Sequence, residues 1–125
     1  MPNKTIQPLD IIREVTAAWG RSDLESLMKF IAEDCVYSAS VGPEPGETFV
    51  GRDAVRTGFA RLLAHDSDGT SEPGETRAVG DWVVSTWGFR KAGPDDRSIL
   101  VRGCDIFSIR DGLIVRKESF RKTYS

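Results

Sequence analysis

Apolar residues recur every three or four positions in three segments of the first half of the chain, which is the spacing of an amphipathic helix. The segments are Pro8–Gly20, Leu24–Ile31 and Arg52–His65. The first begins with a proline, which the first turn of a helix tolerates, and finishes with a glycine, which favours a helix end. Ser22 and Glu25 have the spacing of a capping box, so we expect Ser22 to cap the second helix.

The second half of the chain alternates between strand-like runs and turn residues. The Asp-Gly pair at positions 111 and 112 lies between two such runs and is a strong signal for a β-hairpin. We expect residues 66–74, which are polar and include Gly, Ser and Pro, to form a surface loop. The predicted strands are Cys35–Val41, Thr48–Val50, Glu75–Val79, Trp82–Arg90, Ser98–Arg110 and Leu113–Thr123.

Helices that precede an antiparallel meander indicate an α+β fold. A sheet of long strands twists and coils, which gives it a concave and a convex face, and the helices have to cover one of them. We therefore expect a single domain over residues 1–125, in which a curved, cone-shaped antiparallel sheet packs against three helices from the N-terminal half. The interior of the cone would then hold a pocket.

Three segments resemble the nuclear transport factor 2-like superfamily, which includes the SnoaL-like polyketide cyclases and the ketosteroid isomerases. Residues 23–37 are similar to its helix–helix–strand opening, residues 49–55 to its entry into the third helix, and residues 105–115 to its final hairpin. The resemblance implies a cystatin-like α+β roll and a homodimer formed through the convex sheet face. It does not imply one reaction, because the superfamily includes isomerases, cyclases, dehydratases, epoxide hydrolases and proteins that only bind.

The ketosteroid isomerase branch can be compared residue by residue over Val15–Pro45, which resembles its opening without a gap. Ala39 stands where that branch has its general-base aspartate, and Val15 stands where it has its oxyanion-hole tyrosine. Asp105 matches the second acid of the oxyanion hole, which in that branch is kept protonated by an apolar site. Without the base and the tyrosine, we do not expect the usual ketosteroid isomerase mechanism.

Asp105 is the candidate catalytic residue, because alternate residues of a strand share a face and this acid lies in an apolar row. The other members of the row are Ile99, Val101, Gly103, Phe107 and Ile109. A desolvated carboxyl group there would favour its neutral form and could act as a proton donor or oxyanion stabiliser. The alternatives are that Asp105 pairs with an arginine or with backbone amides, or that a bulge turns it outward.

Aromatic side chains are expected to form the walls of the pocket, and Tyr37 is expected to orient a ligand oxygen unless it is a core residue. The candidate walls are Trp19, Phe59, Trp87 and Phe107. Lys117 and Arg121 share a face of the last strand; we expect Lys117 to point outward and leave Arg121 open. An inward Arg121 would suit a carboxylate or phosphate on the ligand.

Composition excludes several other functions. The net charge of −2 gives no reason to expect nucleic acid or an anionic membrane as a partner, and no apolar run approaches the roughly 20 residues of a membrane helix. His65 is the only histidine and follows the third helix, so it is either a proton shuttle or an exposed helix-end residue. We expect no metal and no cofactor, two free cysteines, and a cytoplasmic protein, because the N-terminus lacks the apolar stretch of a signal peptide.

Three functions are compatible with these residues. The first is a cofactor-independent acid/base enzyme (an isomerase, cyclase or dehydratase) acting on a small hydrophobic, polyketide- or steroid-like ketone, with Asp105 as the proton-transfer group. The second is a protein that binds such a molecule without turnover, which the missing base favours. The third is a protein-interaction module that uses the convex sheet face.

Overall fold

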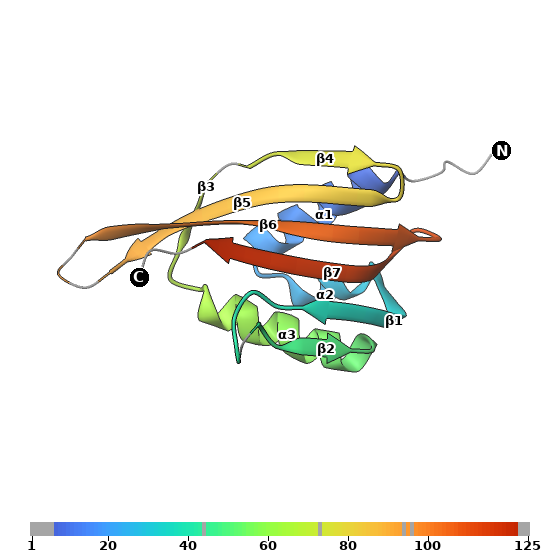
Figure 1. Cartoon of the computed structure of the whole chain (residues 1–125), viewed down its shortest axis with the longest axis horizontal. Coiled ribbons are helices and arrows are strands. Elements are labelled where there is room, and N and C mark those ends of the chain that lie inside the picture. Colours follow the sequence, from blue (N-terminus) through green and yellow to red (C-terminus); the bar gives the residue numbers. More distant parts are fainter. Residues whose placement is uncertain (1–6, 44, 73, 94, 96, 123–125) are drawn as a thin grey trace.

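The structure is a computed structural model that describes residues 7–122 apart from residues 44, 73, 94 and 96 (Figure 1). Within these residues it contains three helices and a seven-stranded sheet, so the predicted α+β class is confirmed. In chain order the elements are α1 (Pro8–Gly20), α2 (Leu24–Met28), β1 (Ile31–Ser38), β2 (Thr48–Val50), α3 (Arg52–His65), β3 (Thr70–Glu72), β4 (Thr76–Val79), β5 (Trp82–Ala92), β6 (Ser98–Arg110) and β7 (Leu113–Lys122).

The sheet is mixed rather than wholly antiparallel. Its strand order is β2-β1-β7-β6-β5-β3, and β4 also pairs with β5. All pairs are antiparallel except β1 and β7, which run parallel. The sequence could not reveal this pair, because turn signals fix the direction of strands that are neighbours in the chain, whereas β1 and β7 are separated by most of it.

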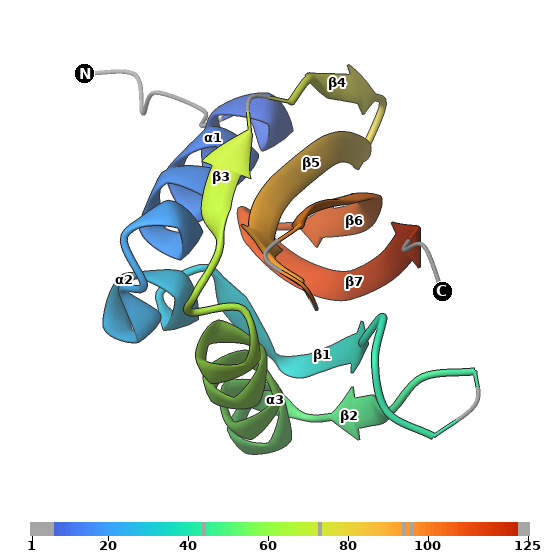
Figure 2. The same ribbon diagram turned by 90° about the vertical axis from the view of Figure 1, so that its left-hand side faces the viewer.

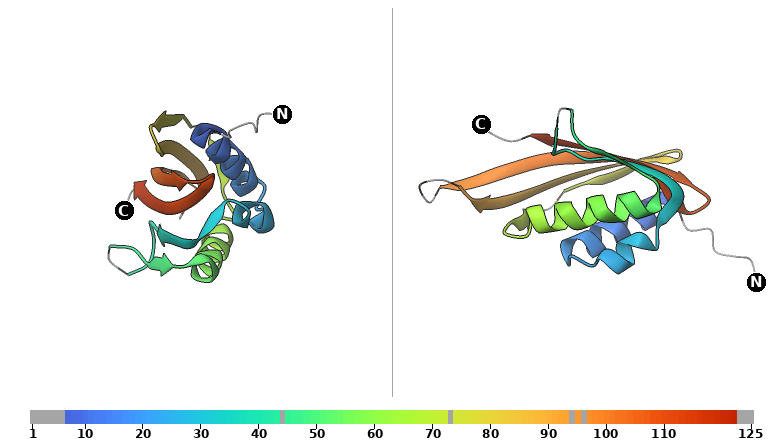
Figure 3. Two further views of the ribbon diagram at one scale, coloured as in Figure 1. Left: turned by 90° about the vertical axis from the view of Figure 1, so that its right-hand side faces the viewer. Right: turned by 90° about the horizontal axis from the view of Figure 1, so that it is seen from below.

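The three helices lie on one side of the curved sheet (Figures 2 and 3). Helix α1 contributes Ile11, Ile12 and Val15 to the core between these layers, and α3 contributes Val55 and Phe59. We call the face of the sheet toward the helices the inner face and the opposite face the outer face. The core occupies one end of the space between the layers, and a cavity occupies the rest.

The start of α2 differs from the expected capping box. Asp23 is the N-cap, and its carboxylate accepts hydrogen bonds from the Ser26 N–H at 3.2 Å and from the Ser26 hydroxyl at 2.6 Å. Ser22 has a φ of 55° and donates its N–H to the carbonyl of Trp19, so it belongs to the end of α1. Helix α2 also ends at Met28, and Ile31 begins β1 instead of continuing the helix.

The turn between β6 and β7 agrees with the hairpin prediction. Asp111 and Gly112 both have positive φ, at 54° and 78°, which is the backbone geometry of a type I′ hairpin turn. The expected surface loop over residues 66–74 instead includes the short strand β3, which pairs with β5. Its residues, Thr70–Glu72, are polar and show no apolar alternation, so the hydrophobic pattern gave no sign of a strand.

Candidate functional site

A cavity of about 360 Å³ lies between the inner face of the sheet and helices α1 and α3. Helix α1 lines it with Val15, Thr16 and Trp19, and α3 lines it with Leu62 and Leu63. The sheet side is made by β1, β3, β5, β6 and β7, which carry many of the polar groups that face the cavity. The cavity volume falls in the usual range for small-molecule sites.

Strand register places the inner-face side chains in three rows that cross the sheet. The first row is Tyr37, Lys117 and Phe107; the second row is Ser119, Asp105 and Ser85; the third row is Arg121, Gly103 and Trp87. Members of all three rows line the cavity. The register therefore sets Asp105 between an aromatic row that holds Lys117 and a row that holds the Trp87 indole.

Asp105 accepts a hydrogen bond from the Trp87 indole N–H, with 3.1 Å between Nε1 and Oδ1. The indole can reach it because Gly103, directly opposite Trp87, has no side chain. A Cβ on Gly103 would lie 2.3 Å from Cζ2 of Trp87 and 2.3 Å from the carbonyl oxygen of Phe120. The second carboxylate oxygen, Oδ2, accepts no hydrogen bond from the residues that the structure describes, so it is free to meet a ligand.

Lys117 is buried, with 4% of its surface exposed, and its ammonium lies among aromatic rings. Nζ lies 3.9 Å from the ring centroid of Trp19, 4.8 Å from that of Phe59 and 4.9 Å from that of Tyr37. Among residues 7–122 as described, it has no hydrogen-bond or ion-pair partner. These three rings form what we call the aromatic cage of Lys117.

Burial lowers the pKa of Lys117, and the negative charge of Asp105 opposes this only in part. Contact with aromatic faces contributes on the order of 2 kcal/mol for a desolvated cation, less than the several kcal/mol that removal of an ammonium from water costs. The cage therefore makes an unpaired lysine tolerable without restoring its ordinary pKa. Burial also raises the pKa of the Tyr37 phenol, and the Asp105 charge adds to this effect.

Arg121 points into the cavity but is already paired. Its guanidinium donates two hydrogen bonds to the Asp66 carboxylate, at 3.3 and 2.8 Å, and Nε donates to the Ser40 hydroxyl at 3.2 Å. It also lies over the rings of Trp87 and Phe89, at 5.3 and 5.4 Å. Because Asp66 neutralises this arginine, the cavity mouth is not the free cationic site that an inward Arg121 would have offered to an anionic ligand.

The structure brings most of the predicted site residues to one cavity. Asp105, Tyr37 and Arg121 line it, together with the aromatic residues Trp19, Trp87 and Phe107. Phe59 does not line it; this ring is 1% exposed and packs behind the cavity against Trp19 and Tyr37. Their roles in catalysis or binding stay predictions.

The expected outward orientation of Lys117 is wrong. A register shift marks a bulge in β7, because Ser108 and Ile109 are consecutive on β6 whereas their partners Arg116 and Ile114 are two residues apart. Ile114 and Lys117 therefore both face inward although an odd number of steps separates them. His65 is exposed at the end of α3, with its Nδ1 2.8 Å from Asp66, and it does not line the cavity. In the sequence, Lys117 shares a strand face with Arg121. Together with knowledge of the bulge, that shared face could have indicated the inward direction of Lys117.

The two positions that depart from the ketosteroid isomerase pattern lie at or beside the cavity. Val15 lines it and offers no hydrogen-bond donor, and Ala39 is a buried core residue. The ionisable residues that line the cavity include Lys117, Tyr37 and Asp105. A group that polarises a ligand oxygen in this cavity therefore differs from the oxyanion-hole tyrosine of that branch.

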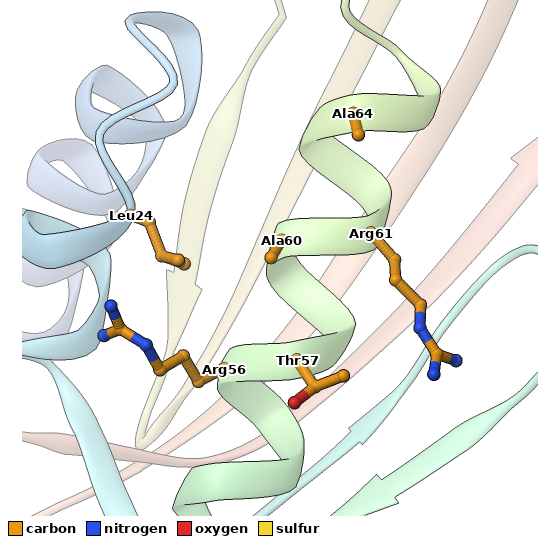
Figure 4. Close-up of a pocket in the computed structure, with 6 residues that line it drawn as sticks. All are labelled: Leu24, Arg56, Thr57, Ala60, Arg61 and Ala64. Carbon is orange, nitrogen blue, oxygen red and sulfur yellow. The ribbon is translucent and has the colours of Figure 1, made fainter.

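A second, more open depression lies on the outer surface of α3 (Figure 4). Arg56 reaches from α3 toward Leu24, while Arg61 extends from the other side of the helix (Figure 4). Both guanidinium groups are paired, Arg56 with Glu25 and Arg61 with Glu47 at 3.1 Å. With its cations neutralised and its floor formed by alanines, this depression offers no reactive group.

Metal-ligand clusters and membrane-spanning helices are both absent from the described part of the chain. No three His, Cys, Asp or Glu side chains there are grouped so that they could hold a metal ion. None of the helices described is long and apolar enough to cross a membrane.

Comparison with known proteins identifies the family. Residues 12–117 match the model of the SnoaL-like domain, and this match covers most of the chain. The chain therefore belongs to the SnoaL-like family of the nuclear transport factor 2-like superfamily, as its sequence motifs predict. Comparison with curated proteins gives no match.

Solved structures show the same fold over nearly the full length. A nuclear transport factor 2-like protein of unknown function from Mesorhizobium loti is 27% identical, with a TM-score of 0.76 over 98% of this chain and 97% of that one. A candidate polyketide cyclase from Xanthomonas campestris is 20% identical, with a TM-score of 0.69 over 94% and 90%. TerC, crystallised with polyporic acid, is 19% identical, with a TM-score of 0.73 over 92% and 91%.

Proposed function

We propose that this protein binds a small, hydrophobic, carbonyl-bearing molecule in the inner cavity and catalyses a cofactor-independent acid/base reaction on it. The reaction classes are isomerisation, aldol cyclisation and dehydration, which share proton transfer next to a carbonyl group. One observation carries the proposal: a carboxylate with a free oxygen and a buried lysine face the same aromatic-walled cavity. The names of two structural neighbours, a candidate polyketide cyclase and a protein crystallised with polyporic acid, support this ligand class.

In this proposal Asp105 transfers the proton. The Trp87 N–H holds Oδ1 and fixes the carboxylate orientation, which leaves Oδ2 to take a proton from carbon or return it. Tyr37 and Lys117 lie in the adjacent row and would polarise the ligand carbonyl oxygen, a task that Val15 cannot perform. Trp19 and Phe107 would enclose the apolar part of the ligand.

The test uses benzylacetone and tetralone, two hydrophobic ketones, in heavy water. We expect the protein to accelerate exchange of the hydrogens next to the carbonyl for deuterium, measured by NMR. Asp105→Asn should slow this exchange by about 100-fold or more, because general acid–base groups contribute at least that factor. Asp81→Asn is the matched control, since Asp81 is an exposed carboxylate in the turn before β5.

The exchange experiment distinguishes an enzyme from a protein that binds ketones without turnover. Binding of the ketones without exchange would support a non-catalytic binding protein, which the absent base at Ala39 favours. An Asp105→Asn variant that exchanges as fast as the unmodified protein would refute the role of Asp105. Absence of both binding and exchange for both ketones would overturn the proposed ligand class.

We also infer that two copies associate through the outer face of the sheet. On that face Trp82 is 54% exposed and Phe120 is 47% exposed, and Cys104 lies opposite Phe120 in the strand register. Large exposed aromatic side chains on one sheet face are typical of an association surface. Their outward direction follows from their neighbours in sequence, because Val83 and Arg121 point inward.

A further inference from the structure

Lys117 differs from the other described lysines in its environment. The chain has five lysines, and Lys29 and Lys122 are exposed while Lys91 is half-buried. Lys117 is 4% exposed, lies in the aromatic cage and lines the cavity. In the part of the chain that the structure describes, its Nζ forms no ion pair with a carboxylate and donates no hydrogen bond to an acceptor.

A lysine of this kind has the properties of a covalent catalyst. A neutral amine is a nucleophile and an ammonium is not, and a hydrophobic pocket favours the neutral form. An imine formed in a largely apolar cavity also meets less water than one in solution, which slows its hydrolysis. We propose that Lys117 forms an imine with the ketone or aldehyde ligand of the cavity, which makes it the catalytic nucleophile; this rests on the proposed function for the class of ligand.

The step balances without any further reagent. The lone pair of Nζ attacks the carbonyl carbon, and the carbonyl oxygen gains a proton to give a carbinolamine. The nitrogen lone pair then expels this hydroxyl group, which leaves as water after a second protonation, and an iminium ion forms. Of the two protons, one comes from the attacking nitrogen and one is taken up from water by Asp105 and passed to the hydroxyl group, which leaves Asp105 as the carboxylate base of the next step. Hydrolysis by water reverses the sequence and restores the amine and the carbonyl compound.

Asp105 is placed to use the iminium ion. It lies on β6 one row from Lys117, which pairs with Phe107, so the two side chains are diagonal neighbours on the inner face. Diagonal neighbours on a sheet are within reach of each other's long side chains, so a ligand carbon next to the C=N bond can lie between Lys117 and Asp105. Oδ2 can then remove a proton from that carbon, the iminium nitrogen accepts the electron pair, and an enamine results.

This chemistry accounts for the two departures from the ketosteroid isomerase pattern. An iminium nitrogen draws electrons from the adjacent carbon without an oxyanion hole, so a valine at position 15 is no obstacle. With Asp105 as the base, Ala39 does not need to carry a carboxylate. The aromatic cage suits the charged intermediate, because the ring faces of Trp19, Phe59 and Tyr37 attract a cation.

The electrostatic surroundings shift Lys117 toward its neutral amine form. The titratable groups that face Lys117 are Asp105 on β6 and Cys35 and Tyr37 on β1, while α1 and α3 face it with uncharged Trp19 and Phe59. Burial lowers the pKa of Lys117 against the opposing charge of Asp105. Burial also raises the pKa of the Cys35 thiol to about 11, so Cys35 is uncharged near neutrality and does not hold the lysine protonated.

Reductive trapping tests the imine directly. The native protein is incubated at pH 7 with benzaldehyde or benzylacetone and sodium cyanoborohydride, which converts an imine into a stable secondary amine. Peptide mass spectrometry then locates the adduct. We expect Lys117 to be modified at least tenfold faster than the exposed Lys29, and this preference to disappear when the protein is unfolded in urea.

Two variants complete the experiment. Lys29→Arg should leave the fast modification in place, and Lys117→Arg, which keeps the charge but cannot form an imine, should remove it. Unmodified Lys117, or modification no faster than at Lys29, would overturn the proposal. The mapping is done on unmodified protein, so a poorly folded Lys117→Arg variant would not prevent this conclusion.

The result of reductive trapping at Lys117 is independent of the result of the deuterium-exchange assay. Exchange that depends on Asp105 without trapping at Lys117 would leave the proposed function standing and remove the imine. Trapping at Lys117 with exchange that Asp105→Asn does not slow would keep the imine and remove Asp105 as the base.

Discussion

Charged side chains on the two faces of strand β7 lie in opposite environments. On the outer face Arg116 is exposed and pairs with Glu118, whose side chain is also accessible to water. On the inner face Lys117, the very next residue, is buried without an ion pair among the described residues, and Arg121, whose side chain is 8% exposed, has Asp66 as its partner. An exposed charge has little effect on the free energy of folding, whereas a buried charge carries a desolvation penalty. The inner face is therefore the one on which a function other than stability accounts for the residues.

The largest effect is expected when the buried charge itself is removed. Lys117→Met replaces a buried, unpaired amino group by an apolar side chain of similar shape, and we expect the free energy of unfolding at pH 7 to rise by on the order of 1–4 kcal/mol. Chemical denaturation measures this difference. A loss of stability instead would mean that the aromatic cage contributes more than desolvation costs.

The same variant has a predictable pH dependence. Because the pKa of Lys117 is lowered from its ordinary value of 10.5 on folding, the unfolded chain holds this proton at pH values where the folded chain has released it. Stability of the unmodified protein should then rise with pH through that range, by at most about 1.4 kcal/mol per pH unit. The comparison is made from pH 7 to 9, below the ordinary pKa of 9.0 of the Cys35 thiol, which contributes stability that is lost at higher pH. The advantage of Lys117→Met should shrink over this range, and an unchanged difference would contradict a lowered pKa.

An intermediate effect is expected in the third row of the inner face. Gly103→Ala places a methyl group where the Trp87 indole now lies, so Trp87 has to move and its hydrogen bond to Asp105 is lost. Overpacking of this kind costs about 1–3 kcal/mol, and the free energy of unfolding should fall by that amount. Ketone-dependent exchange should fall with it, because Asp105 loses its fixed orientation.

The control for this change is Gly20→Ala at the end of α1, where an added Cβ meets no atom within 4 Å. It should leave the unfolding free energy within about 0.5 kcal/mol of the unmodified protein. If Gly103→Ala changed the unfolding free energy as little as Gly20→Ala, the close contact between Gly103 and Trp87 would not position the Asp105 carboxylate.

The same contrast explains how far the sequence alone could predict the molecule. Asp105 was found because alternation along β6 is regular near it, and its register with Ser85 and Ser119 needs no bulge. The direction of Lys117 does not follow from alternation, because the bulge between Ile114 and Arg116 shifts the pattern of β7 by one residue and no turn residue marks that bulge. Helices with strong apolar periodicity were predictable for the same reason as Asp105, since their pattern is local.

What could not be predicted depends on pairing between distant segments. The parallel contact of β1 with β7 places Tyr37 beside Lys117 and so completes the aromatic cage with Trp19 and Phe59. The three rings of that cage come from α1, β1 and α3, and the lysine that they enclose comes from β7. A one-dimensional pattern records which residues are apolar, but it does not record which of them enclose the same ammonium.

The smallest effect on folding is expected on the outer face. Phe120→Ser removes a ring that is 47% exposed, so the unfolding free energy of dilute protein should change by no more than about 0.5 kcal/mol. If the outer face joins two copies, the same substitution should nevertheless reduce the molar mass in solution from that of a dimer to that of a monomer, measured by light scattering after gel filtration. Arg116→Ala, on the same face but charged and paired with Glu118, should alter neither quantity. A dimer that survives Phe120→Ser, or a monomeric unmodified protein, would show that the exposed rings of the outer face do not hold two copies together.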